Sequence, residues 1–302
     1  MSENVKPGGD WRVFLVLGRV SNLPTVWSNC LAGVILAGAS PSWAPYLLLA
    51  GGITLFYVGG MYLNDAFDQA WDARNRPGRP IPSGRIRLEM VYALGFGQVL
   101  LGLALLIGAA WVSSPGETPV VGLGGVALGL VIVYYNFRHK QNPLGPLVMA
   151  LTRALVYFIA AALAGASLAG GVLAGMVVLL GYLIGLTYVA KQETLREVKN
   201  LWPLAFLGAP FLFTAWRGTQ AGGLNVEAGI IGVTLLVWVV WSLTHLFHTG
   251  TRNIPRVVVS LIAGISLVDA LLVALAGGES WAWVAAAGFP LTLFFQRYIS
   301  GT

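Results

Sequence analysis

Charged residues are scarce in this chain, and their scarcity excludes an ordinary water-soluble fold. Asp, Glu, Lys and Arg together make up 10% of the 302 residues, whereas 57% are hydrophobic. A soluble domain of average composition contains about 25% charged residues. Cysteine is nearly absent as well: Cys30 is the only one, so a disulfide within the chain is excluded. Most of the chain is therefore expected to face lipid or other apolar helices.

Long polar stretches are also missing, so we expect one domain over 1–302, with approximate halves 11–140 and 146–250, and no soluble domain. A membrane span needs about 20 mostly apolar residues. The last of the candidate spans contains Pro290 and could instead be re-entrant or interfacial. The prediction is an all-α, polytopic membrane bundle of nine to ten transmembrane helices. The candidate spans are 12–38, 43–66, 88–112, 119–137, 146–169, 171–190, 200–216, 227–247, 256–277 and 280–298.

The basic residues predict the orientation of the bundle. They concentrate in every second loop, whereas the alternating loops contain only Arg217. Loops rich in Lys and Arg stay in the cytoplasm, so the N-terminus and the charged loops are expected there, in the inner or plasma membrane of the cell. The same loops account for the net charge of +6. Because these residues do not form one amphipathic face, we predict no nucleic-acid binding.

Acidic residues number only 12, yet oxygen-bearing side chains gather where the second span ends. Asn64, Asp68 and Asp72 are four residues apart, so a helix places them on one face, with Asp65 beside them. Carboxylates packed this closely repel one another unless a cation compensates, and hard oxygen ligands suit Mg²⁺. Taken alone, these residues fit a solvated helix end equally well.

A stiff basic loop follows the acidic residues. Pro77, Pro80 and Pro82 fix their own φ angles and so limit the mobility of the segment. Arginines in and beside it can form forked hydrogen bonds with phosphate oxygens; they are Arg74, Arg76, Arg79 and Arg85. A metal site directly beside guanidinium groups suits a diphosphate.

A second acidic pair occurs four spans later. Glu193 and Glu197 are again four residues apart, with Lys191, Arg196 and Lys199 around them. An ordinary helix with alternating charges would give the same pattern. Two carboxylate-bearing helices on the same side of the membrane favour a shared two-metal diphosphate site.

The first acidic motif closely resembles that of the UbiA-type intramembrane prenyltransferases. The matching residues are Asn64-Asp65-(x)2-Asp68-(x)3-Asp72, then Asn75-Arg76-Pro77-(x)-Arg79-Pro80-Ile81-Pro82-Ser83-Gly84. The resemblance covers most of the chain and implies a helical bundle whose central cavity is capped by cytoplasmic loops. It also implies Mg²⁺-dependent transfer of a prenyl group from a prenyl diphosphate to a lipid-soluble aromatic or hydroxyl acceptor. Asn64, Asp68 and Asp72 match the positions that bind the diphosphate through Mg²⁺.

The second motif departs from the family pattern. That pattern is Asp-(x)3-Asp, and here Glu193 and Glu197 occupy its place, each with one additional methylene. The stretch 187–193 also resembles a divergent branch called EboC-like. The metal ligands implied are Asn64, Asp68, Asp72, Glu193 and Glu197, and the four carboxylates are the predicted catalytic residues. The predicted substrate-binding residues are Arg19, Asn22, Arg74, Arg76, Arg79, Arg85, Arg153, Lys191, Arg196, Lys199, Tyr62 and Tyr188.

Ionisable residues inside spans are a further signal, because a charge in mid-membrane costs about 2.5–3.5 kcal/mol and normally faces a cavity or a partner. Arg153 could line the diphosphate pocket or extend to the cytoplasmic side. Asp269 could contact the acceptor or pair with an interior donor. Arg19 and Asn22 are expected to face the cavity. His245 and His248 have the spacing of metal ligands, but a helix C-terminus suits histidines for electrostatic reasons alone.

Two other functions fit parts of this pattern. A divergent relative could keep the fold and bind or help to export a prenyl lipid or metabolite precursor without catalysis. A phosphatidyl-type transferase also uses intramembrane carboxylates, but the Asp-Gly-(x)2-Ala-Arg sequence that begins its motif is absent. The expected partners are a prenyl diphosphate, a hydrophobic acceptor and membrane lipids.

Overall fold

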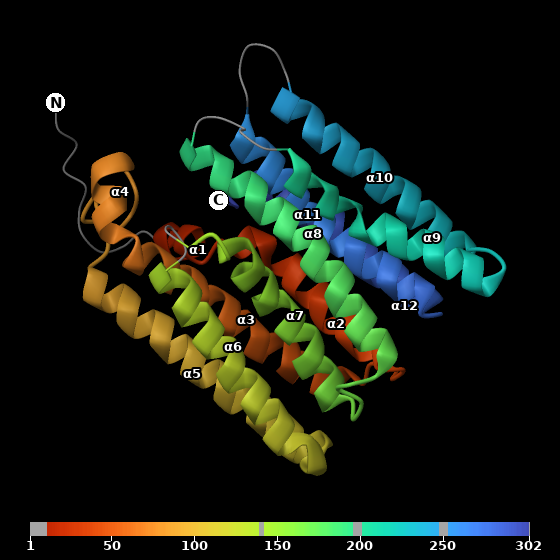
Figure 1. Cartoon of the computed structure of the whole chain (residues 1–302). Coiled ribbons are helices and arrows are strands. Elements are labelled where there is room, and N and C mark those ends of the chain that lie inside the picture. The colour runs from red at the N-terminus through yellow and green to blue at the C-terminus, as the bar shows by residue number, and fades with distance from the viewer. Residues whose placement is uncertain (1–10, 139–141, 196–200, 248–252, 302) are drawn as a thin grey trace.

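The computed structural model describes residues 11–138, 142–195, 201–247 and 253–301, and over these ranges the chain forms only helices and connecting turns. Within these described ranges, seven helical segments are long and apolar enough to cross a membrane. They lie alongside one another in a single bundle (Figure 1). The spanning helices are α3 (Trp43–Phe67), α5 (Leu88–Ser113), α6 (Thr118–Arg138), α7 (Gly145–Leu163), α8 (Gly170–Leu195), α10 (Val226–Phe247) and α11 (Ile254–Leu275).

Three predicted spans correspond to shorter or less regular elements, so the predicted count of nine to ten is not confirmed. The first, 12–38, is wrong as one continuous helix. Arg19 adopts a left-handed conformation with φ of 43°, which breaks the segment. The pieces are α1 (Arg12–Leu17), the 3₁₀ turn η1 (Val20–Asn22) and α2 (Leu23–Leu36). The other two correspond to η3 (Trp202–Gly208) with α9 (Ala209–Ala221), and to α12 (Glu279–Gln296).

The two most enclosed helices are α2 and α11, which pack against each other in the middle of the bundle. In the apolar part of α11, 89% of the residues are buried, against 22% in α5 and 28% in α10. Outward-facing leucines, valines and tryptophans on α5 and α10 are compatible with lipid as the surrounding solvent. A polar side chain on α2 or α11 therefore reaches the protein interior rather than lipid.

Glycines allow close backbone contact between α3 and α5. A Cβ on Gly59 would lie 2.7 Å from the carbonyl oxygen of Gly95, and one on Gly102 would lie 2.8 Å from that of Gly52. Small residues at two levels thus bring these helices together, as is common in membranes. This packing fixes the helix that carries the predicted acidic motif.

The acidic motif lies at the end of α3, where Asp68 separates it from the short helix α4 (Gln69–Asn75). Figure 1 shows that α1, α4 and the C-terminus all gather at this end of the bundle. Asn22 donates to the carbonyl oxygen of Gly301 over 2.9 Å, so the last described residues lie against η1. Segments far apart in the sequence therefore meet around the end of α3.

Candidate functional site

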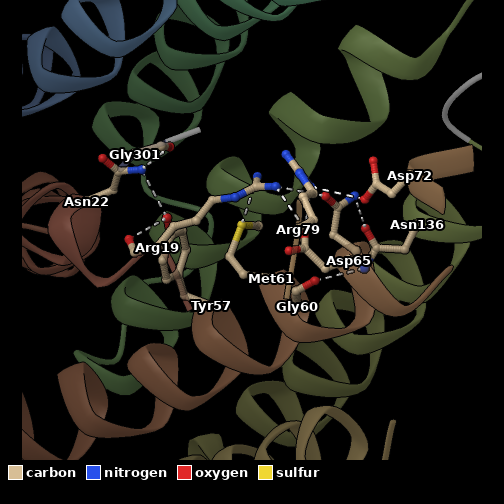
Figure 2. A network of polar contacts seen from close by, with 11 residues as sticks. Arg19, Asn22, Tyr57, Gly60, Met61, Asp65, Asp72, Arg79, Asn136 and Gly301 are labelled. Carbon is tan, nitrogen blue, oxygen red and sulfur yellow. Dashed lines mark hydrogen bonds and ion pairs between the residues drawn. The ribbon is translucent and has the colours of Figure 1, made fainter. Parts of the chain in front are cut away.

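Two arginines from different segments converge on Asp65 (Figure 2). Arg19 Nη2 lies 3.2 Å from Asp65 Oδ1, and Arg79 Nη1 lies 3.0 Å from the same oxygen. Arg79 also contacts Asp72 Oδ2 at 3.3 Å, which links the end of α3 to α4. Both carboxylates are almost fully buried, with 9% and 3% of their side chains exposed. Because these carboxylates have little contact with water, the arginines compensate their negative charge.

Local structure explains how the two arginines reach Asp65. Arg19 occupies the left-handed break between α1 and η1, and this break lets its side chain extend to α3, where its Nη2 also contacts Asn64 Oδ1 at 3.2 Å. Arg79 belongs to the proline-containing loop, which is anchored by the buried residues Pro80 and Ile81.

Asn64 is held by protein groups on both sides of its amide. Its Oδ1 accepts from Arg19, and its Nδ2 donates to Asn136 Oδ1 of α6 over 3.1 Å. Asn136 in turn donates to the carbonyl oxygen of Gly60 over 3.0 Å. Asn64 therefore couples α3 to α6 and to the Arg19 guanidinium.

The arginines line an open pocket of about 400 Å³ at this end of the bundle. Four of the predicted substrate-binding arginines meet there with Asp65: Arg19, Arg76, Arg79 and Arg85. Arg74 is exposed on α4 and does not line the pocket. Even with Asp72 paired to Arg79, two buried carboxylates against four guanidinium groups leave an excess of positive charge, so the pocket suits a polyanion.

A second, largely apolar cavity of about 60 Å³ is lined by residues of α2, α3, α6 and α7. The walls of the two spaces touch where Arg19, which lines the arginine pocket, donates through Nη1 to Sδ of Met61, which lines the apolar cavity, over 3.4 Å. Tyr57 and Tyr135 line the cavity. Tyr62 does not: it is buried, and its hydroxyl donates to the carbonyl oxygen of Phe14.

The predicted metal ligands are only partly described. Among the described side chains, no three carboxylate, histidine or cysteine groups come together in a way that could hold a metal ion. Asp68 lies half-buried at the α3–α4 junction, one helical turn from Asp72. Their oxygen donors suit Mg²⁺ that keeps waters and substrate phosphates as its other ligands. The residues present thus fit an ion that arrives with a diphosphate better than a permanently bound one.

The second acidic pair falls outside the described side chains, as do Arg196, Lys199 and His248. The described side chain nearest to the pair in sequence, Lys191, donates to the carbonyl oxygen of Asn142 over 2.6 Å. Tyr188 is half-buried on α8. His245 packs against the Trp241 ring, with 4.6 Å between ring centroids, which agrees with the structural role expected for it.

Arg153 of α7 lines the apolar cavity and does not reach the arginine pocket. Its guanidinium carbon lies 5.5 Å from the centre of the Tyr57 ring, a cation–π distance. It donates to Asn29 Oδ1 over 2.6 Å and to the backbone and hydroxyl oxygens of Thr25, both at 3.1 Å. The sequence also allowed Arg153 to extend out of the bundle to the cytoplasmic side. Its burial excludes this extension.

Asp269 of α11 is the buried counterpart of Arg153, and Asn29 connects them. The Asn29 amide donates to both oxygens of Asp269 at 2.8 Å while its own oxygen accepts from Arg153. The hydroxyls of Ser28 and Tyr157 also donate to Asp269. We name Arg153, Asn29 and Asp269 the central polar network.

The sequence analysis missed three residues of these sites. Asp65 was placed beside the acidic face but not among the site residues, and it is the carboxylate that binds two arginines. Asn29 and Asn136 were not singled out. A polar amide inside an apolar span was an available signal for both, because such a group needs a partner in the membrane interior.

A pocket lined by arginines that adjoins an apolar cavity inside a helix bundle defines a membrane protein built to hold an amphiphile with an anionic head. A profile described as the UbiA prenyltransferase family matches residues 25–300. The chain belongs to this family, so it is an integral membrane protein and an enzyme of the prenyltransferase class. Members of the family generally use Mg²⁺.

The chain is similar to two proteins of known name over most of its length. It is 28% identical to digeranylgeranylglyceryl phosphate synthase of Methanoregula boonei, over 89% of this chain and 86% of that one. It is 30% identical to the enzyme of the same name from Methanopyrus kandleri, over 89% of this chain and 90% of that one. A solved structure of digeranylgeranylglyceryl phosphate synthase superposes with a TM-score of 0.58 at 18% identity, covering 88% of this chain and 97% of that one. This last likeness concerns the fold.

Proposed function

We propose that this protein transfers a prenyl group from an allylic diphosphate to a lipid-soluble hydroxyl or aromatic acceptor within the membrane. The observation that carries the proposal is the contact of Arg19, which lines the arginine pocket, with Met61, which lines the apolar cavity. An anionic head among the arginines would place the first carbons of an attached apolar chain at the entrance of the apolar cavity. A diphosphate with an isoprenoid tail has these two properties.

The proposed reaction breaks the bond between the allylic carbon and the diphosphate oxygen. Arg19 and Arg79 would stabilise the charge that develops on the departing diphosphate, exchanging part of their contact with Asp65 for phosphate oxygens. Asp68 and Asp72 would hold Mg²⁺, which supplies further positive charge to the same oxygens. The allylic carbon then bonds to the acceptor, and the acceptor loses a proton.

The apolar cavity would protect the electron-deficient allylic carbon from water. Tyr57 and Tyr135 present aromatic rings to the cavity, and aromatic faces attract positive charge. Apolar side chains such as Ile53, Phe56 and Leu128 form most of the remaining wall. The names of the two relatives support a hydroxyl of a glycerophosphate lipid as the acceptor.

We further propose that the arginine pocket faces the cytoplasm, and that α2, α9 and α12 complete the membrane-embedded bundle, which gives nine to ten crossings in all. The asymmetric distribution of basic residues supports this orientation. Replacing Arg85 by Cys tests it, because the native Cys30 is buried. A membrane-impermeant maleimide should label Arg85→Cys only in inverted membrane vesicles; labelling only in right-side-out vesicles would contradict the orientation.

The activity is tested with purified protein in liposomes, Mg²⁺, labelled geranylgeranyl diphosphate and a panel of hydroxyl and aromatic acceptors. A labelled product that disappears in Asp68→Ala is the expected result. Arg87→Ala serves as a matched control, because Arg87 is an exposed loop residue that lines neither pocket. Diphosphate binding without product from any acceptor would instead support a protein that binds or helps to export a prenyl lipid.

The second acidic pair needs its own test. If Glu193 and Glu197 form the opposite wall of the metal site, Glu193→Ala should abolish transfer as Asp68→Ala does. Unchanged transfer in Glu193→Ala would show that the first motif binds the diphosphate without a second acidic site.

A further inference from the structure

The central polar network contains donor groups that the protein itself does not use. Arg153 has 7% of its surface exposed, and the space it borders is the apolar cavity. A guanidinium group has five N–H donors. Within the described part of the chain, the contacts of Arg153 to Thr25 and Asn29 occupy three of them. Two donors therefore remain for an oxygen atom inside the cavity.

The position of Arg153 separates it from the diphosphate pocket. It lies eight residues after Gly145, the first residue of α7, which corresponds to a depth of about 12 Å along the helix. Tyr57 lies between the two levels: its ring contacts Arg153, while its hydroxyl accepts from Asn22 and donates to the carbonyl oxygen of Arg19. A group bound at Arg153 is thus deeper in the bundle than the head group bound by Arg19.

The charge of Arg153 is already balanced. Asp269 is fully buried and accepts from Ser28, Asn29 and Tyr157, as an ionised carboxylate does. Asn29 bonds to both partners and holds them on opposite sides of its amide. A carboxylate or phosphate added at Arg153 would leave one uncompensated negative charge in the interior, which is strongly unfavourable.

We propose that Arg153 binds a neutral oxygen of the acceptor, a hydroxyl or a carbonyl and not a phosphate, and that Asp269 makes this site select against an anionic group. The assignment of the ligand as the acceptor rests on the proposed transfer function. The binding preference does not, because it follows from two unused donors and a balanced pair of charges. Arg153 and Asp269 are then residues that determine specificity.

Two probes of matched shape test this preference: 4-hexylphenol, which is neutral, and 4-hexylbenzoate, which is anionic. Their binding to the purified full-length protein in detergent is measured by titration calorimetry at neutral pH. Since partition into micelles is the same for every variant, changes between variants report on the protein. Wild type should bind the phenol about tenfold more tightly than the benzoate.

Two variants separate the roles of the two charges. Arg153→Met with Asp269→Asn removes both charges together, so folding is not burdened by a lone buried ion; phenol binding should weaken about tenfold. Asp269→Asn alone leaves Arg153 uncompensated, and benzoate binding should strengthen about tenfold. Tyr182→Phe is the matched control, because it removes a buried hydrogen bond between α8 and α11 outside the cavity.

Unchanged phenol binding in the double variant would overturn the proposal, as would an equal preference for both probes in wild type. Titration of wild type with geranylgeranyl diphosphate forms a separate arm. If this diphosphate does not bind, the proposed transferase function fails, whereas the two probes still decide the role of Arg153. If it binds equally well to wild type and the double variant, the two sites are independent.

Discussion

The molecule contains two arginine–aspartate clusters that differ in balance and in depth. Around Asp65, four arginines line an open pocket at the end of the bundle. Around Asp269, one arginine is matched by one aspartate through Asn29, in the enclosed middle of the bundle. The first cluster keeps positive charge available for a ligand, whereas the second cancels its charge and offers only hydrogen bonds. Net charge, more than residue type, decides what each site can bind.

The largest effect is expected from Arg79, because it contacts two carboxylates and lines the outer pocket. Arg79→Met removes a donor from the departing diphosphate and leaves Asp72 without this partner. Transfer in liposomes should fall by about 100- to 1000-fold. Arg87→Met, which changes an exposed arginine outside the pocket, should retain wild-type rates. Similar rates in both variants would show that Arg79 serves the loop structure alone.

At the inner cluster, replacing arginine by methionine should change the stability of the protein. Arg153→Met leaves Asp269 buried without its counter-charge, which should lower the free energy of unfolding by about 3 kcal/mol. Arg153→Met with Asp269→Asn should recover most of this loss, because both charges disappear together. Denaturant titrations in detergent, followed by tryptophan fluorescence, measure the free energy of unfolding of the single and the double variant. If the double variant is no more stable than Arg153→Met alone, the two residues do not interact, and the comparison between the clusters fails.

The sequence predicted the outer cluster better than the inner one, for reasons visible in particular residues. Hydropathy placed α3 and α5 to within one residue, since each is a single apolar run. The arginine pocket followed from a proline-rich loop close in sequence to Asp72. The break at Arg19 was missed, because the left-handed arginine is held there by tertiary contacts with α3, among them that of its guanidinium with Asp65.

The inner cluster could not be assembled from sequence, because its members are far apart in the chain. Asn29 and Asp269 are separated by 240 residues, and only the packing of α2 against α11 brings them together. Asp269 and Arg153 were recognisable as intramembrane charges, but the intervening amide was needed to show that they belong to one network.

The contact between α2 and α7 holds the inner cluster in place, and Gly33 permits that contact. A Cβ at this position would lie 2.6 Å from Ala160 Cβ and 2.8 Å from the carbonyl oxygen of Tyr157. Gly33→Ala should therefore lower the free energy of unfolding by about 1–3 kcal/mol through overpacking. Gly97→Ala on α5 is the matched control, because its added Cβ meets no atom within 4 Å. Equal stability of the two variants would mean that α2 and α7 separate without cost.

The smallest effect is expected at the rim of the outer pocket. Arg85 is exposed, and its guanidinium donates to Ser83 Oγ and to the carbonyl oxygen of Gly78. An exposed charge contributes little because water and salt screen it, so Arg85→Ala should weaken geranylgeranyl diphosphate binding by about threefold. The deficit should shrink as salt is raised from low to physiological ionic strength. Binding of 4-hexylphenol at the balanced inner cluster should not change over the same range, and a parallel salt dependence of both ligands would show that the two clusters do not differ in charge balance.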